Sequence, residues 1–376
     1  MAAVNKVLVI GGGFSGMAAA IKMRRHGIDV DLVEIDPEWC ELGAGITING
    51  ASMRALEDLG LYDQVVEKGC VTSGVAINLP HGPRLMELPT PSPVGSTVGG
   101  SGGIFRPTLA RIMSAATVEA GVDARPGCTY TSITMTDEGA EVEFTDGSTR
   151  SYDLIIGADG VHSQLRKEYF PEVPAPEYIG QGVWRAIMPR PTEINQVTMW
   201  MGNHLKLGVN PVSDTHMYMF ITEDRPTKEH IDKETWPQVF ADLMGNFPNP
   251  IVQSLIPHVF KAEANIDYRP LANLLVPMPW NRGRLVMIGD TVAATTPHLA
   301  SGAGIGIESG IVLADELSAN DTLQAALDKF HARRWERCRL VVENSARLCH
   351  IEINDGDRQE HSKIMGQSLA ALAQPI

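Results

Sequence analysis

Apolar runs at the start of the chain alternate with a glycine-rich turn and a helix-forming stretch. Lys6–Ile10 is a short β-branched run, residues 11–16 form the turn, and residues 17–26 are rich in helix formers. Residues 28–34 are a second apolar run, and Gly27 follows three cationic residues that suit a helix C-terminus. This order predicts a parallel βαβ unit with a right-handed crossover.

Further segments carry helical or alternating patterns. Residues 109–120 have helical spacing, residues 129–134 and 140–145 alternate as strands do, and Asp146-Gly147 is a hairpin signal. Residues 154–156 and 284–288 are short buried strands by composition. Helices are predicted over 309–317 and 323–350, whereas the last dozen residues carry little signal.

Residues 178–221 contain three or four runs rich in Val, Met, Tyr, Phe and Trp, separated by turns. This pattern is typical of an antiparallel sheet, and it predicts a second domain inserted into the first. Residues 77–103 are rich in Pro, Gly and Ser, which favours a loop or linker. The predicted fold class is α/β, a Rossmann-like domain with an inserted antiparallel sheet and C-terminal helices. Its expected parts are 1–75, 99–177 and 271–376 for the first domain and the C-terminal helices, 178–270 for the inserted sheet, and 76–98 for further strands and a loop of that sheet domain.

The composition and the charge narrow the possible functions. The 376 residues suit about two domains, and 44% hydrophobic with 20% charged residues is ordinary for a globular protein. The formal net charge of -14 disfavours nucleic acid and anionic membrane as partners. The five cysteines form no CxxC pair and have no His spacing typical of zinc, so reduced thiols and no metal site are expected. Cysteine usage, the absence of a secretory signal and the lack of an apolar run of membrane-spanning length favour a cytoplasmic protein.

The first motif with chemical meaning is Gly11-x-Gly13-x-x-Gly16, with Glu34 placed 23 positions after Gly11. Glycines permit a tight turn and close approach of the backbone to a pyrophosphate, and the helix N-terminus supplies N–H donors. An acid at the end of the second strand accepts hydrogen bonds from ribose hydroxyls. Because strand, helix and acid all occur in the required order, the motif predicts dinucleotide binding, with FAD and NAD both open.

Two later segments also follow predicted strands. In the first, which begins at Gly157-Ala-Asp-Gly160, Asp159 and Arg166 could fix the turn by a charge-assisted hydrogen bond. In the second, which begins at Gly289-Asp290, the aspartate is placed to accept a ribitol or ribose hydroxyl, and glycines at 302–306 open a helix. Three such segments together suggest a single extended ligand.

These three motifs, in this order, resemble those of the class A flavoprotein monooxygenases, the aromatic-ring hydroxylases similar to para-hydroxybenzoate, salicylate and urate hydroxylases. The resemblance covers nearly the whole chain. It implies that Glu34 binds the adenosine ribose, that Arg111 with its neighbour Arg106 touches the FAD phosphates, and that Asp290 binds the ribitol. The full set of implied FAD contacts is Gly11, Gly13, Phe14, Ser15, Gly16, Glu34, Arg106, Arg111, Asp159, Asp290, Pro297, Gly302, Ala303 and Gly304.

Two departures from the family pattern concern the third motif. The family usually has Gly-Asp-Ala-Ala-His, whereas this chain has Gly-Asp-Thr-Val-Ala at 289–293 and lacks the histidine. The usual Gly-Gln-Gly is replaced by Ser301-Gly-Ala-Gly304. FAD binding should survive because backbone amides do much of the binding there.

The resemblance also implies a mechanism. NADH or NADPH reduces FAD, and O2 then forms a C4a-hydroperoxide whose distal oxygen attacks a small electron-rich aromatic or N-heteroaromatic compound. A phenol reacts best once deprotonated, so a base within hydrogen-bond reach is expected. Tyr218, His298 and His204 are the catalytic candidates. Thr47, Trp184, Arg185, Lys206 and His216 are the substrate candidates, although a buried structural Trp is the commoner outcome.

Several alternatives remain open from the sequence. The same flavin chemistry could yield epoxidation or oxidative decarboxylation. An NAD-dependent dehydrogenase would use the first βαβ unit but leaves the Gly289-Asp290 segment unexplained. A non-catalytic flavin-binding protein is the third class, and a homodimer is a further expectation. Arg333, Arg334, Arg337 and Arg339 form a basic cluster that is expected to be a solvated helix face.

Overall fold

A computed structural model describes residues 2–39 and 43–376. The predicted βαβ unit is confirmed, because β1 and β2 pair in parallel across α1 (Phe14–Arg25). They belong to a six-stranded sheet in which every pairing is parallel except that of the edge strand β18. The strand order is β18 (Asn281–Arg282), β19 (Leu285–Met287), β12 (Leu154–Gly157), β1 (Lys6–Ile10), β2 (Asp29–Glu34) and β8 (Asp123–Pro126).

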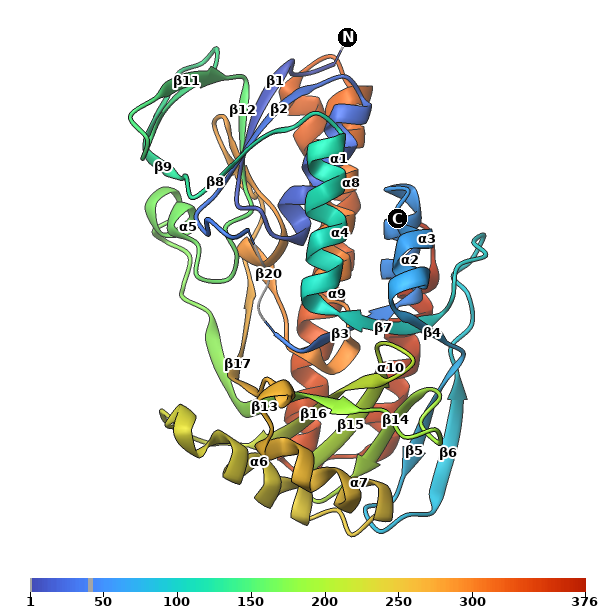
Figure 1. Ribbon diagram of the computed structural model, residues 1–376. Helices are drawn as coiled ribbons and strands as arrows, with labels where there is room; N and C mark the ends of the chain where they lie inside the picture. The colour runs from blue at the N-terminus through green and yellow to red at the C-terminus, as the bar shows by residue number, and fades with distance from the viewer. Residues whose placement is uncertain (1, 40–42) are drawn as a thin grey trace.

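Helices α1, α4 (Arg106–Glu119) and α8 (Gly302–Ala319) stand together beside this parallel sheet (Figure 1). Helix α5 (Gln164–Tyr169) follows β12. A small antiparallel sheet of β9 (Tyr130–Met135), β10 (Ala140–Phe144) and β11 (Thr149–Tyr152) packs on the same apolar core. The hairpin predicted at Asp146-Gly147 joins β10 to β11.

The predicted antiparallel sheet forms the second layer, at the bottom of Figure 1. Its core pairs β13, β16 and β15 along most of their length, which places alternate residues of all three strands on one face. The other face packs on α6 (Trp236–Gly245) and α7 (Pro250–Leu255). The full order is β20 (Ala293–Ala294), β17 (Asp267–Leu275), β13 (Glu177–Pro189), β16 (His216–Asp224), β15 (Leu205–Pro211), β14 (Val197–Met201), β5 (Gly74–Asn78) and β6 (Arg84–Pro89).

A three-stranded sheet of β3 (Gly45–Asn49), β7 (Ser101–Phe105) and β4 (Cys70–Thr72) lies between the two large sheets. Helices α2 (Gly50–Asp58) and α3 (Tyr62–Lys68) connect β3 to β4. The long helix α9 (Leu323–Ile353) runs from the upper layer down to the eight-stranded sheet, and α10 (Arg358–Ala373) packs beside it (Figure 1).

The prediction of a loop over residues 77–103 is wrong where β6 and β7 form. The glycines of β7 misled the composition argument, because they are needed for close approach between strands. A Cβ on Gly102 would lie 2.4 Å from the carbonyl oxygen of Cys70, and one on Gly103 would lie 2.5 Å from that of Pro211. The C-terminal segment, where no element was predicted, forms α10, whose N-cap Asp357 accepts a hydrogen bond from the backbone of Gln359.

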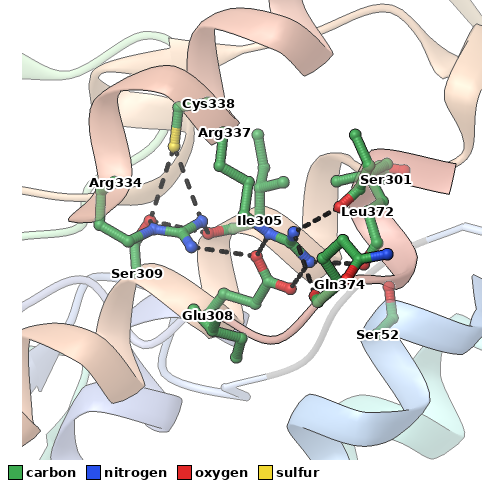
Figure 2. A network of polar contacts seen from close by, with 12 residues as sticks. Ser52, Ser301, Ile305, Glu308, Ser309, Arg334, Arg337, Cys338, Leu372 and Gln374 are labelled. Carbon is green, nitrogen blue, oxygen red and sulfur yellow. Dashed lines mark hydrogen bonds and ion pairs between the residues drawn. The ribbon is translucent and has the colours of Figure 1, made fainter. Parts of the chain in front are cut away.

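The expectation of a solvated arginine face on α9 is also wrong for two of its four residues. Arg334 is 0% exposed and pairs with Glu308 of α8 at 3.1 Å, and Arg337 binds both oxygens of the same carboxylate at 2.7 Å (Figure 2). Arg333 and Arg339 are the partly solvated pair, with 37% and 40% of their side chains exposed. The arginines of α9 were expected on a solvated face of that helix. Because α8 packs against α9 here, Arg334 and Glu308 instead form an ion pair inside the core.

The same network binds the end of the chain. Arg337 donates to the carbonyls of Ala371, Leu372 and Gln374, at the C-terminus of α10 (Figure 2). Arg54 of α2 donates to the carbonyls of this last turn as well. Cations at a helix C-terminus satisfy carbonyls that lack partners within the helix.

The four described cysteines Cys70, Cys128, Cys338 and Cys349 are free thiols, as expected, and Cys40 lies outside the described residues. No group of His, Cys, Asp and Glu side chains suited to a metal ion occurs among the residues described. Within 2–39 and 43–376, none of the helices has the length and apolar character to cross a membrane.

Candidate active site

The first and third glycine motifs meet at Ser15, in the first turn of α1. A Cβ on Gly289 would lie 2.3 Å from Ser15 Oγ, and a Cβ on Gly306 of α8 would lie 2.2 Å from the same atom. Gly289 also has a φ of +66°, a conformation that favours glycine. The absence of side chains at 289 and 306 therefore lets the third motif approach the start of α1.

The first and second motifs are equally close. A Cβ on Gly11, whose φ is +109°, would lie 2.3 Å from the carbonyl oxygen of Ala158. A Cβ on Gly16 would lie 2.1 Å from the carbonyl oxygen of Gly11. The turn after β1 is thus compact because only hydrogen atoms fit at these positions, which is the steric role that the motif predicts.

Thr291 joins the second motif to the third. Its hydroxyl accepts a hydrogen bond from the backbone N–H of Gly160 at 3.1 Å and donates to Asp159 at 3.3 Å. Its carbonyl accepts from the buried guanidinium of Arg166 at 2.8 Å. Arg166 therefore bonds backbone carbonyls here, including that of Val161, in place of the Asp159 hydrogen bond considered from sequence.

Asp159 has a different local role from the one expected. Its carboxylate accepts from the backbone N–H groups of Gln164 and Leu165, at 2.9 and 3.2 Å, at the start of α5. The aspartate thus stabilises a helix start and, through Thr291, fixes the turn after β12.

Two helix N-termini converge on this region with their first amides uncapped. Among the described side chains, none makes a capping hydrogen bond at Gly13 of α1 or at Ser301 of α8. Free N–H groups at a helix N-terminus attract anions and electron-rich oxygens. The compact glycine turns and these two N-termini together fit an elongated dinucleotide such as FAD.

Glu34 lies at the end of β2, beside the first glycine turn. Its Oε2 accepts from the N–H of Gly12 at 2.7 Å and its Oε1 accepts from the N–H of Asp36 at 2.8 Å. The indole of Trp39 donates to the carbonyl of Gly12 at 2.9 Å. The half-buried carboxylate is thus oriented by the backbone at the position predicted for a ribose contact.

The two arginines assigned to the FAD phosphates are placed differently. The Arg106 guanidinium lies over the ring of Phe14, with its carbon 4.9 Å from the ring centroid, so it stands at the N-terminus of α1. Arg111 is exposed and bonds Thr108 of its own helix at 3.1 Å. Geometry thus favours Arg106 over Arg111 as the cation nearest the glycine turn.

The loop before α8 is fixed from the side of α2. Asn49, the N-cap of α2, donates through Nδ2 to Ser301 Oγ at 2.7 Å. Ala300 adopts a left-handed conformation with a φ of 48°, and a Cβ on Gly304 would lie 2.1 Å from Ser52 Oγ. The Pro297–Leu299 turn and the residues 302–304 are therefore held between α2 and α9. Asp290 is exposed at the start of the turn after β19.

The second layer contributes the inner face, defined here as the face of the eight-stranded sheet opposite α6 and α7. Register places the side chains of Tyr218 and Ile187 side by side on it, with Asn210 on the other side of Tyr218. Arg185 donates from Nε to the Tyr218 hydroxyl at 3.3 Å, and its NH1 lies 3.5 Å from Asp267. A phenol, a guanidinium and an amide therefore share this face.

Apolar and aromatic residues surround these polar groups. Tyr218, which is 7% exposed, packs in one cluster with side chains from four other segments. A Cβ on Gly45 of β3 would lie 2.5 Å from Tyr218 Cβ, so β3 sits directly on the inner face. Asn210 Nδ2 donates to Thr47 Oγ1 of the same strand at 3.0 Å. The other cluster members are Ala44, Phe105, Ile187, Val212 and Phe220.

Trp184 requires a correction, because it is on the opposite face of the sheet. It is 0% exposed, packs edge-on against Phe240 of α6 and donates from Nε1 to Glu223 at 2.6 Å. The neighbouring Arg185 points the other way because successive strand residues alternate. Trp184 is a core residue and does not line the inner face.

Two histidine candidates are near the rim of the sheet. His204 is a left-handed turn residue whose two ring nitrogens contact Asp224 at 2.6 Å and Asp355 at 3.0 Å. The hydrogen bond to Asp224 is the main cause that raises the pKa of His204. His216 is exposed and lies beside the ring of Phe105, with a centroid distance of 6.1 Å. His216 therefore borders the cluster around Tyr218 through Phe105, whereas His204 is held by the two aspartates.

His298 and Lys206 do converge, on a residue that the sequence did not single out. His298, with 1% of its side chain exposed, lies 3.3 Å from Glu352 of α9, and Lys206 of β15 binds the same carboxylate at 2.7 Å. His361 of α10 also contacts Glu352 at 3.2 Å. Burial lowers the pKa of His298, against the raising effect of Glu352.

Sequence reasoning missed Thr291, Asn210 and Glu352. Asn210 could have been found, since it is an even number of residues from Lys206 and therefore shares its strand face. Thr291 adjoins a recognised motif, where a hydroxyl is a natural turn-forming group. Glu352 offered no signal, because nothing local indicates that this turn of a long charged helix is buried.

Comparisons with known proteins agree with this geometry. A family profile described as FAD binding domain matches residues 5–345. The chain is 26% identical over 371 residues to a putative FAD-dependent monooxygenase, YetM, of Bacillus subtilis, covering 98% of this chain and 99% of that protein. It is 30% identical to the 2-heptyl-3-hydroxy-4(1H)-quinolone synthase of Pseudomonas aeruginosa, covering 82% of this chain and 79% of that protein.

A solved structure has a closely similar fold. It is that of Klebsiella pneumoniae HpxO complexed with FAD and uric acid. The TM-score is 0.83 at 24% sequence identity, and the alignment covers 97% of this chain and 92% of that one. Both layers of the present structure therefore occur together in a protein that holds FAD and a heteroaromatic compound.

Proposed function

The chain belongs to the FAD binding domain family and is an FAD-dependent monooxygenase, and from this premise we propose that it hydroxylates a small electron-rich aromatic or N-heteroaromatic compound. The proposed electron donor is NADH or NADPH, which binds transiently, and the oxidant is O2. When bound, FAD supplies the activation of O2, which protein side chains cannot perform alone.

The observation that carries the proposal is the position of Tyr218 and Arg185 on the inner face, beneath β3. The half-buried rings of Phe105 and Phe220 at the edge of this cluster would supply aromatic faces on which a planar substrate stacks. Within it, the phenol of Tyr218, the guanidinium of Arg185 and the amide of Asn210 supply a small number of polar groups for orientation. Such a combination suits an aromatic ring with oxygen or nitrogen substituents.

The residues around the glycine turns would hold the cofactor. Glu34 would accept from the adenosine ribose, the α1 N-terminus with Arg106 would bind the pyrophosphate, and Asp290 would accept from the ribitol. The amides of Gly302, Ala303 and Gly304 would face the electron-rich edge of the ring system. The missing family histidine is replaced by Ala293, which is buried, while Thr291 links this segment to Gly160.

The protein groups would then prepare the substrate. Tyr218 would hold the hydroxyl or ring nitrogen, and Arg185 would stabilise negative charge that develops on the aromatic oxygen. Deprotonation raises the electron density of the ring, which makes attack on an electrophilic oxygen easier. The aromatic cluster would keep water out of the site.

Two relatives indicate which compounds to test first. The names printed for them are FAD-dependent urate hydroxylase and 6-hydroxynicotinate 3-monooxygenase, and these describe those proteins. We therefore propose a screen of purines, hydroxypyridines, quinolones and phenolic acids with FAD-loaded protein. The expected result is substrate-stimulated NAD(P)H oxidation, O2 uptake and a product heavier by one oxygen atom.

The same screen separates the alternatives. A product that has lost the substrate's carboxyl group as CO2 would redirect the proposal to oxidative decarboxylation, and a product that carries an epoxide would redirect it to epoxidation. Flavin-loaded protein that binds aromatic compounds without any O2 uptake would favour a non-catalytic flavin-binding protein. A homodimer is a further proposal, which light scattering of the holoprotein tests.

A further inference from the structure

Phe220 of β16 lies on the inner face between two apolar clusters. It packs with the cluster around Tyr218, and it packs with a second cluster, the α9-side cluster, whose buried members are Ile179, Val183, Leu271 and Cys349. We propose that Phe220, seated over Gly208, determines substrate size by closing the substrate site toward the α9-side cluster. The inference rests on the proposed function, because it concerns the same site and defines which ring systems that site accepts.

The strand register gives Phe220 one neighbour on each side. Phe220 pairs directly with Arg185 of β13 and with Gly208 of β15. Its side chain shares the inner face with Tyr218, because residues two positions apart on a strand point to the same face. The ring can therefore lie over β13, where it would meet Arg185, or over β15, where it would meet Gly208.

The ring lies over β15, and Gly208 is the reason. A Cβ on Gly208 would be 2.1 Å from Cζ of Phe220 and 2.5 and 2.8 Å from its two Cε atoms. The inner-face neighbours of Gly208 on the same strand are Lys206 and Asn210, which both carry side chains. Gly208 thus leaves the gap between them that the outer edge of the ring occupies.

The lean toward β15 keeps the space over β13 for Arg185. The Arg185 guanidinium donates from Nε to the hydroxyl of Tyr218 at 3.3 Å, and 21% of its side chain remains exposed. Tyr218 and Phe220 have ring centroids 5.6 Å apart, so the two rings stand side by side with an angle of 34° between their planes. A Phe220 ring turned toward β13 would displace the guanidinium, and the polar groups proposed to orient the substrate would be lost.

Phe220 also closes the site toward α9. The members of the α9-side cluster are each 7% exposed or less, and Cys349 comes from α9 itself. Among the described residues, Phe220 is the one side chain that packs against both this cluster and the cluster around Tyr218. A ring system held at Tyr218 and Arg185 therefore meets Phe220 on that side. The site should accept a compact ring system and disfavour an apolar chain that extends toward α9.

The test compares 4-hydroxyquinoline with isomers that carry a pentyl chain at C2, C6 or C7. Equilibrium dialysis of the FAD-loaded protein gives each dissociation constant without turnover. In Phe220→Ala, at least one pentyl isomer should gain about tenfold or more in affinity over 4-hydroxyquinoline, because each methylene buried where the ring was contributes roughly fourfold. Phe260→Ala, at a phenylalanine that is 56% exposed, is the control and should leave the preference unchanged. The absence of any gain in Phe220→Ala would overturn the proposal.

Gly208→Ala should act in the opposite direction. Its Cβ forces the ring off β15 and toward Arg185, so binding of 4-hydroxyquinoline itself should weaken by about tenfold, the usual scale of an overpacked site. The double variant Gly208→Ala/Phe220→Ala should bind it as Phe220→Ala does, because no ring is left to displace. Gly245→Ala, where nothing lies within 4 Å of the Cβ position, is the matched control. A loss that persists in the double variant would overturn the steric role of Gly208.

A crystal structure of the Gly208→Ala holoprotein gives the ring position without any ligand. The Phe220 ring should turn toward β13 and break the contact between Arg185 and Tyr218, and a structure that keeps this contact would overturn the proposal. If Phe220→Ala loses cooperative thermal unfolding, Phe220→Leu should show the same change of preference. FAD-loaded protein that binds none of the quinolines would instead contradict the proposed aromatic site, and with it the size limit. Binding with unaltered preferences in the variants would contradict the size limit alone, so the two failures are distinguishable.

Discussion

Ser15 Oγ occupies the space that a side chain on Gly306 would need, since a Cβ there would lie 2.2 Å away. This contact joins the first turn of α1 to the first turns of α8, and with them the first glycine motif to the third. The arrangement makes the dinucleotide site a property of three distant segments, because none of them is complete without the others.

Gly306→Ala should therefore weaken both the fold and flavin retention. Overpacking a filled core typically costs about 1–3 kcal/mol, and the displaced α8 would carry its N-terminus away from α1. Thermal unfolding and the FAD content after gel filtration measure the two effects. Gly366→Ala in α10 is the control, because nothing lies within 4 Å of its Cβ position. If the two variants had the same unfolding temperature and the same FAD content, close packing at Gly306 would not be what holds α8 against α1.

Thr291→Val should lower FAD content without removing side-chain volume. The variant leaves the partly buried N–H of Gly160 without the hydroxyl that accepts from it, which should cost about 1 kcal/mol. Equilibrium dialysis against FAD gives the affinity, and Thr192→Val at an exposed position is the comparison. Unaltered affinity would mean that the turn after β12 is fixed by Asp159 and Arg166 alone.

The ion pair in Figure 2 predicts a large loss of stability when one partner is removed. Arg334→Met leaves Glu308 buried with only part of its compensation, and breaking such a pair typically costs about 3–5 kcal/mol. Arg339→Met, at a solvent-exposed pair, should destabilise the fold far less, because exposed ion pairs contribute little. Urea unfolding compares the two, and similar midpoints would contradict the structural role of Arg334.

The ion pair of Glu308 with Arg334 and Arg337 also makes the folding stability depend on pH. Burial alone would raise the pKa of Glu308, but Arg334 and Arg337 outweigh burial and keep it below its usual range. A depressed pKa in the folded state contributes stability above the unfolded value of about 4.5, and this is lost as pH falls through the folded value. Unfolding free energy measured below pH 5 should fall less steeply in Glu308→Gln than in the wild type.

Tyr218→Phe should slow hydroxylation more than flavin reduction. The variant removes the hydroxyl that accepts from Arg185 while it keeps the aromatic packing, so substrate orientation is lost and cofactor binding is not. A loss of about 10²-fold in the oxygen-transfer step is expected when a group that orients the substrate is removed. Rapid-mixing spectroscopy separates the two steps, and equal rates for both would exclude Tyr218 from the reaction.

Trp184→Phe should act on stability alone. The indole is buried between the sheet and α6, so its loss leaves Glu223 with Arg225 as its remaining donor and opens a void beside Phe240. The melting temperature should fall while the KM for the aromatic substrate stays unchanged. A change in KM without a change in stability would place Trp184 in the substrate site after all.

The turns, strands and alternation patterns were predicted well from the sequence, because each depends on residues that are neighbours in the chain. The turn at Gly11, the strand before Gly157 and the alternation around Tyr218 all follow from residues a few positions apart. The strand β7 was missed because its glycines serve strands that are distant in sequence. Arg334 and Glu352 were missed for the same reason, since only the packing of α9 against α8 and β15 buries them.

The central claim is that three separate glycine segments hold one FAD, and the flavin content of the purified protein tests it most directly. We predict a yellow protein with one FAD per chain, released intact on denaturation, and a largely colourless Asp290→Ala variant beside a fully loaded Asp137→Ala control. Wild-type protein that contains no flavin, and that takes up none when FAD is supplied, would contradict the account.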